Sequence, residues 1–131
     1  MSYPDCKGVN VIMKYIVITN NPLVYNKVED ASYYSNASFY DILIRVRDKV
    51  HLGHRLLTHP LSGSVKPGHT PYKSVVISAL QGEKTDYGSL ALIEYALDIA
   101  GRVKTKIWGD RVLLDFQLSD YSLIADIVIN T

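Results

Sequence analysis

Two short runs of β-branched residues, separated by a long segment with helical spacing, constrain the fold of this chain more than any other feature. Residues 16–18 and residues 75–77 consist only of valine and isoleucine, as expected for strands buried on both faces. Between them, residues 38–52 repeat apolar side chains at helical spacing. The alternation predicts an α/β fold, a three-layer sandwich with a mostly parallel central sheet and helices on both faces.

The same patterns set the expected boundaries. Ser38 can cap the first long helix, with Asp41 three residues later, and Gly53 can end it. A second strong helix begins at Asp86 and carries apolar side chains over a wide surface, which predicts deep burial. Residues 104–131 suit either a helix or an edge strand; we favour helix, with Asp120 as the cap of a last helix. The expected strands are residues 15–19, 31–34, 55–58 and 73–80, and a short helix is expected over residues 23–28.

The chain of 131 residues fits one domain. Residues 1–12 show no clean helical or strand period, so we interpret them as an extension that precedes a single α/β domain over residues 13–131. Met13 is a second possible start of translation. If translation begins there, residues 1–12 do not belong to the native protein; we state this as a hypothesis.

Composition narrows the class of protein. With 14 Lys plus Arg against 13 Asp plus Glu, the net charge of +1 provides no broad field for nucleic acid or anionic lipid. The single cysteine, Cys6, cannot form an internal disulfide, and no apolar run has the roughly 20 residues of a membrane-spanning helix. We therefore expect a cytoplasmic protein that binds neither nucleic acid nor membrane.

Two polar segments follow expected strands. Thr19, Asn20 and Asn21 end the first strand, while Thr58 and His59 end the strand over residues 55–58. Ligands of parallel α/β sheets bind beyond the carboxyl ends of the strands, so the two segments are expected to share one site. The asparagines could bind a polar ligand, and paired asparagine is equally typical of a turn.

The connection after His59 contains Ser62, Gly63 and Ser64, whose backbone N–H groups could form an anion-binding concavity. Lys66 or Lys73 could add positive charge. A plain β-turn is the competing interpretation, and the chain has neither a Walker loop nor a GxGxxG pattern.

His59 is the candidate catalytic residue, because imidazole titrates near physiological pH. A structural histidine that closes a strand end is the competing interpretation. A metal site could in principle combine His59 with three other histidines, His51, His54 and His69. Gly53 ends the helix between His51 and His54, so these two do not share a helix face, and we predict no metal and no cofactor.

Ten tyrosines are many for this length, and Tyr33, Tyr34 and Tyr40 lie close in sequence. Tyrosine suits a protein interface, and it also suits the edge of a core. The basic residues Arg45, Arg47 and Lys49 are interrupted by acidic ones and are typical of a solvated helix face.

Three segments together resemble the GrdX family, small proteins associated with glycine, sarcosine and betaine reductase systems of amino-acid-fermenting anaerobes. They are MKYIVITNNPLV at residues 13–24, the run from Val46 through His51, Gly53 and Leu57 to His59, Pro60 and Leu61, and Lys66 and Pro67 followed by TPYKS at residues 70–74. The resemblance covers residues 13–78 and implies a metabolic setting without a reaction or catalytic residues.

The resemblance and the polar segments together predict a non-catalytic accessory protein that binds a small anionic metabolite, such as an amino acid or an acyl phosphate. The expected ligand-binding residues are Thr19, Asn20, Asn21, Thr58, His59, Ser62, Gly63, Ser64 and Lys73. Two alternatives stay open: a small hydrolase or transferase that uses His59 as acid or base, and an assembly factor that docks on a reductase subunit through Tyr33 and Tyr34.

Overall fold

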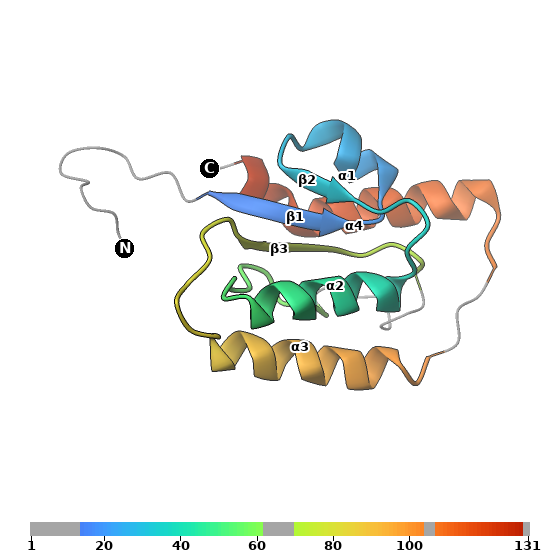
Figure 1. Ribbon diagram of the computed structural model, residues 1–131. Coiled ribbons are helices and arrows are strands. Elements are labelled where there is room, and N and C mark those ends of the chain that lie inside the picture. The colour runs from blue at the N-terminus through green and yellow to red at the C-terminus, as the bar shows by residue number, and fades with distance from the viewer. Residues whose placement is uncertain (1–13, 62–69, 104–106, 130–131) are drawn as a thin grey trace.

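The centre of the molecule is a small mixed sheet (Figure 1). The computed structural model describes residues 14–61, 70–103 and 107–129. Its strands are β1 (Tyr15–Thr19), β2 (Ala31–Tyr33) and β3 (Ser74–Ser78), in the order β2-β1-β3. β1 is parallel to β2 and antiparallel to β3. The α/β prediction is confirmed, whereas the prediction of a mostly parallel sheet is wrong.

β3 also pairs with the segment that precedes it in the chain. Leu56 forms an isolated antiparallel bridge with Ile77, so residues 55–58 run along the outer edge of β3 before the chain returns as β3. The predicted strand over residues 55–58 is reduced to this bridge. The side chain of Thr58 provides the physical reason, because its hydroxyl oxygen replaces a backbone carbonyl as acceptor for the N–H of Val76, at 3.0 Å.

One face of the sheet is covered by α2 (Phe39–His51) and, beyond it, α3 (Tyr87–Ala100). The prediction for α2 is confirmed, including the capping box of Ser38 and Asp41. Gly53 ends the helical segment with a φ of 111°, a backbone conformation that favours glycine. The buried residues of α2 pack against the β1 and β3 side chains of this face, namely Ile18, Val75 and Ile77.

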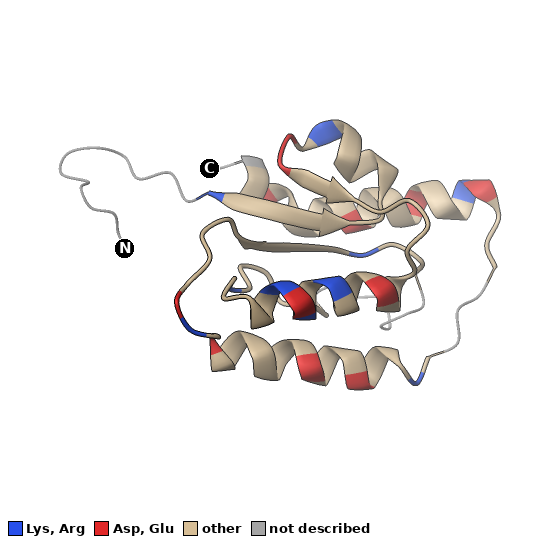
Figure 2. Ribbon diagram, in the orientation of Figure 1, with Lys and Arg blue, Asp and Glu red and all other residues tan. Residues whose placement is uncertain are grey.

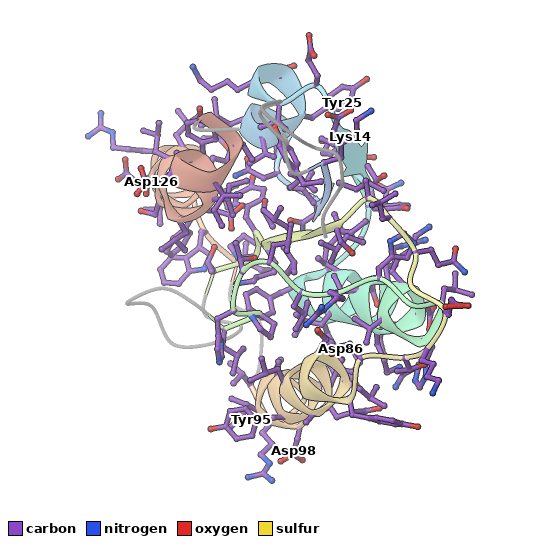
Figure 3. All side chains as sticks on the ribbon, turned by 90° about the vertical axis from the view of Figure 1, so that its left-hand side faces the viewer. Lys14, Tyr25, Asp86, Tyr95, Asp98 and Asp126 are labelled. Atoms are coloured by element: carbon purple, nitrogen blue, oxygen red, sulfur yellow. The ribbon has the colours of Figure 1, made fainter. Side chains whose placement is uncertain are left out.

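α3 is buried on one side only. Ile93, Ala96 and Leu97 pack into the core, while Leu92 and Tyr95 are exposed. Figure 3 shows α3 as an outer element, with Tyr95 on its side away from α2. The wide apolar surface predicted for this helix is therefore not deeply buried in the structure, because α3 packs against α2 and not directly on the sheet.

The other face of the sheet is covered by α1 (Pro22–Lys27) and α4 (Asp110–Ile129). Val17 and Val76 pack there with Val24 and Ile124. The prediction that Asp120 caps a last helix is wrong, since α4 is continuous from residue 110 and Asp120 lies in its middle. The carboxylate of Asp120 accepts hydrogen bonds from the sheet and none from its own helix, so the helix does not begin there.

Charged residues are confined to the helices and connections. The three strands contain none, and Figure 2 shows acidic and basic residues interspersed along α2, whereas the charged residues within α3 are all acidic. Within the described residues, no helix is both long and apolar enough to cross a membrane. The extension over residues 1–12 lies outside the described residues, so the proposed start at Met13 stays a prediction.

Candidate functional site

The end of β1 and the beginning of β3 lie side by side. Thr19 is paired with Ser74 in the sheet register, and the next residues, Asn20 and Lys73, face each other across the strand ends. The N–H of Lys73 donates to Oδ1 of Asn20 at 2.9 Å. Four predicted site residues, Thr19, Asn20, Asn21 and Lys73, therefore meet at one end of the sheet.

The other predicted residues form a second group. Thr58 is half-buried and bonded to the backbone of Val76, as described above. His59 is exposed, and its Nδ1 accepts a hydrogen bond from the N–H of Leu61 at 3.0 Å. Among the described residues, no carboxylate pairs with His59. Ser62, Gly63 and Ser64 lie outside the described residues.

A buried carboxylate connects α4 to this end of the sheet. Oδ2 of Asp120 accepts hydrogen bonds from the hydroxyl of Ser74 at 2.6 Å and from Nδ2 of Asn21 at 3.0 Å, and Oδ1 accepts the N–H of Ser74 at 3.1 Å. The hydroxyls of Ser74 and Thr19 lie 2.7 Å apart. We call Asp120, Ser74, Thr19 and Asn21 the Asp120 network.

The Asp120 network is closed within the protein. Asp120 is 5% exposed, and burial raises the pKa of its carboxyl group, although the hydrogen bonds from Ser74 and Asn21 oppose that rise. Oδ1 of Asn21 accepts the N–H of Leu23 and caps α1. These bonds satisfy the polar groups that α4 and the sheet bury together, so the network serves first to hold α4 on the sheet.

Lys73 lies on the opposite side of the strand from the Asp120 network. Its side chain extends toward the N-terminus of α2, where Nζ stands 5.6 Å from the ring centroid of Phe39. The residue is 3% exposed. Within the described part of the chain, Nζ forms no hydrogen bond and no ion pair. We call Lys73, Asn20 and Phe39 the Lys73 site.

The electrostatics of Lys73 are those of a buried cation with incomplete compensation. Burial lowers the pKa of its ammonium group to about 8, and attraction from Asp120 opposes the shift only in part. The Asp120 carboxylate forms hydrogen bonds with Ser74 and Asn21 on the other face and no ion pair with Lys73. The face of the Phe39 ring adds a cation–π contact.

Asn20 fixes the backbone beneath Lys73. Its Nδ2 donates to the carbonyl oxygens of Ala37 and Pro71, both at 2.8 Å, while Oδ1 accepts from Lys73. Both amide hydrogens are thus used within the protein. Asn20 ties β1, the connection before α2 and the segment before β3 together, and the structure gives it a positioning role.

The tyrosines expected at an interface have partners within the chain. Tyr33 stacks on Tyr25 with ring centroids 4.6 Å apart, and the guanidinium of Arg45 lies 4.0 Å from the ring centroid of Tyr34. Both rings are half-buried. They border an open groove of about 630 Å³ between the β2–α2 connection and α2.

The histidines considered for a metal site are dispersed. His54 is buried with Nδ1 2.7 Å from the carbonyl oxygen of Ser78, whereas His51 is exposed at the end of α2. His69 lies outside the described residues. No group of three histidine, cysteine or acidic side chains suited to a metal ion occurs in the described residues.

Sequence reasoning missed the Asp120 network. The signal available in the sequence was the position of Asp120, four residues after Phe116 and four before Ile124. These two side chains are half-buried and buried, and an aspartate on the same apolar stripe of a helix needs a buried partner. Lys73 was predicted as a ligand-binding residue that could add positive charge beside residues 62–64. The structure instead buries its ammonium group against the Phe39 ring.

Comparison with known proteins adds one match. The model of the GrdX-like protein family matches residues 16–129. The search of curated proteins and the search of solved structures give no match.

Proposed function

The chain belongs to the GrdX-like protein family, and from this membership and the Lys73 site we propose that it is a cytoplasmic accessory protein of a glycine reductase-type system that binds a small anionic metabolite. The family name supports the metabolic setting. The single observation that supports anion binding is the buried ammonium group of Lys73, which has no anionic partner within 4 Å among the described residues.

A buried cation is costly unless an opposite charge compensates it. The Asp120 carboxylate compensates the charge only in part, because it attracts the ammonium group without forming an ion pair with it. A carboxylate or phosphate at Nζ would therefore gain a charge-assisted hydrogen bond in a largely desolvated place. The first turn of α2, near Phe39, adds a weak favourable dipole, although the capping box already satisfies part of that helix end.

The alternative functions have weaker support. A hydrolase using His59 needs a partner that orients the imidazole, and the bonded neighbour in the structure is the backbone N–H of Leu61. Docking through Tyr33 and Tyr34 competes with their contacts to Tyr25 and Arg45. We therefore favour anion binding at Lys73.

The test is a thermal-shift titration at constant ionic strength with phosphate, acetate, glycine and small acyl phosphates. We expect at least one anion to raise the melting temperature saturably, because a ligand that binds only the folded state stabilises it. The shift should vanish in Lys73→Met and persist in Lys84→Met, which removes an exposed lysine.

His59→Ala, also in the panel, separates the two polar segments. Loss of the shift in His59→Ala with retention in Lys73→Met would move the site to the segment after residue 58. Absence of any shift in a folded wild-type chain would reject anion binding.

A further inference from the structure

We propose that the open groove between the β2–α2 connection and α2 binds amino acids with an apolar side chain. The carboxylate of the ligand pairs with Arg45, and its ammonium group pairs with Asp48. Both residues line the groove, and Lys73 does not. Binding in the groove is therefore independent of the anion binding proposed at Lys73.

Three charged side chains of α2 border the groove. Asp41, Arg45 and Asp48 are spaced by four and three residues, so they lie on one face of the helix, whose mixed charges are seen in Figure 2. Within the described residues, none of the three forms an ion pair. The carboxylate of Asp41 accepts the N–H of Ser38 in the capping box. The side chain of Asp48 has no hydrogen bond in the described part of the chain, so its carboxylate is available to a ligand.

The contact between Arg45 and Tyr34 prepares the guanidinium for a carboxylate. The guanidinium carbon lies over the half-buried ring, 4.0 Å from its centroid. A stacked guanidinium keeps its N–H donors at its edge, where one carboxylate can accept two of them in parallel. The side chain of Arg45 donates no hydrogen bond to any described residue, so these donors are open to a ligand.

The charges determine the class of ligand. The two aspartates repel an anion that carries no positive charge, and Arg45 repels a cation that carries no carboxylate. An amino acid has both charges attached to one carbon. Its carboxylate can contact Arg45 while its ammonium group contacts Asp48, which is one helical turn away. Neither contact requires an existing ion pair of the described chain to break.

The apolar part of the lining favours an apolar side chain on the ligand. Tyr34, Ala37 and Ile44 are half-buried where they border the groove. The groove has a volume of about 630 Å³, within the range of small-molecule sites. A side chain the size of leucine would remove apolar surface of these residues from water, and glycine has no side chain with which to do so.

The experiment titrates the isotope-labelled full chain with L-leucine and follows two-dimensional amide NMR spectra, which also report whether each variant is folded. We expect saturable shifts centred on residues 33–37 and 44–48. Leucinamide lacks the carboxylate and N-acetylleucine lacks the ammonium group. Each should bind at least about tenfold more weakly than leucine, because each loses a charge-assisted contact. Glycine should also bind more weakly than leucine.

Matched variants locate the site. Arg45→Gln and Asp48→Asn should each weaken the binding of leucine at least about tenfold. The controls are Arg47→Gln on the same helix and Asp115→Asn on the exposed side of α4, and neither residue lines the groove. Both controls and Lys73→Met should leave the affinity for leucine unchanged.

The outcomes separate this binding from the proposed function. Absence of saturable shifts with leucine overturns amino-acid binding, and so does equal binding of leucinamide or N-acetylleucine. Equal binding of glycine overturns the preference for an apolar side chain. Leucine binding that is lost in Lys73→Met and retained in Arg45→Gln overturns the groove as the site and supports binding at Lys73. A thermal shift by anions that depends on Lys73 is measured separately, so either site can fail while the other is retained.

Discussion

Replacement of Lys73 by methionine is expected to stabilise the protein at neutral pH. The lysine is 3% exposed and its ammonium group has no ion pair among the described residues, so the folded state bears a desolvation cost that the unfolded chain does not. Methionine fills similar volume and retains a favourable sulfur–aromatic contact with Phe39. The substitution thus removes a buried charge without opening a large cavity.

The magnitude follows from the shift in pKa. A fall from 10.5 to about 8 corresponds to roughly 3 kcal/mol of destabilisation while the group is charged in both states. The substitution also removes the cation–π contact, which reduces the expected gain in stability by about 1 kcal/mol. We therefore expect Lys73→Met to raise the free energy of unfolding by about 1–3 kcal/mol at pH 7.

The dependence on pH gives a sharper test. Below pH 8 the lysine is protonated in both the folded and the unfolded state, so the cost is constant. Between pH 8 and pH 10.5 the unfolded chain keeps a proton that the folded chain has released, so wild-type stability rises relative to the variant. The difference between wild type and Lys73→Met should shrink accordingly toward pH 10.5.

Urea unfolding followed by circular dichroism, at pH 7 and at pH 10, measures this difference. Lys84→Met is the matched control, with an expected change within about 0.5 kcal/mol at both values because the side chain is exposed. Destabilisation by Lys73→Met at pH 7, or a difference independent of pH, would refute the reasoning and indicate a paired ammonium group.

Three further substitutions test the fold by urea or thermal unfolding. Asp120→Asn should lower the free energy of unfolding by about 2 kcal/mol, because an amide N–H would face the Ser74 groups that donate hydrogen bonds to the carboxylate. Asp126→Asn, on the exposed side of α4 (Figure 3), should change the free energy of unfolding little. Equal effects of the two substitutions would contradict the buried network. Gly53→Ala should cost at least about 2 kcal/mol, since its Cβ would stand 2.3 Å from a backbone oxygen at a φ of 111°, while Gly109→Ala, with open space, tests whether alanine itself is tolerated. Ser38→Ala should cost about 1 kcal/mol through loss of the capping box, and no loss would contradict that role.

Local patterns predicted the elements that local physics determines. The apolar spacing and the capping box of α2 are properties of residues 38–52 alone, and the β-branched runs of β1 and β3 fix extended backbone. Both therefore appear at the predicted positions.

The direction of β3 and the role of Asp120 could not be read from the sequence in the same way. The hydroxyl of Thr58 ends the pairing of residues 55–58 with β3, and the antiparallel direction of β3 shows only in its pairing with Leu56 and β1, which are distant in sequence. Asp120 is suited to a helix cap by residue type, and only its distant partner Ser74 makes it a buried acceptor.

The candidate site was predicted in part for a similar reason. Thr19, Asn20, Asn21 and Lys73 do meet, but through antiparallel pairing of β1 with β3. Tertiary neighbours decide the role of each side chain. Asn20 donates a hydrogen bond to Ala37, and Lys73 lies against the Phe39 ring without an ion pair in the described residues. Residue type alone does not distinguish a ligand donor from a structural one.

The most direct test of the account is the pKa of Lys73 itself, measured by NMR titration of its side-chain Cε and Hε signals, with Lys73→Met for assignment. In the free protein we predict a value of about 8, rising toward the ordinary 10.5 when the anion with the largest thermal shift is bound. A value near 10.5 in the free protein, or one that a saturating anion leaves unchanged, would contradict the claim that Lys73 is a buried cation awaiting an anionic partner.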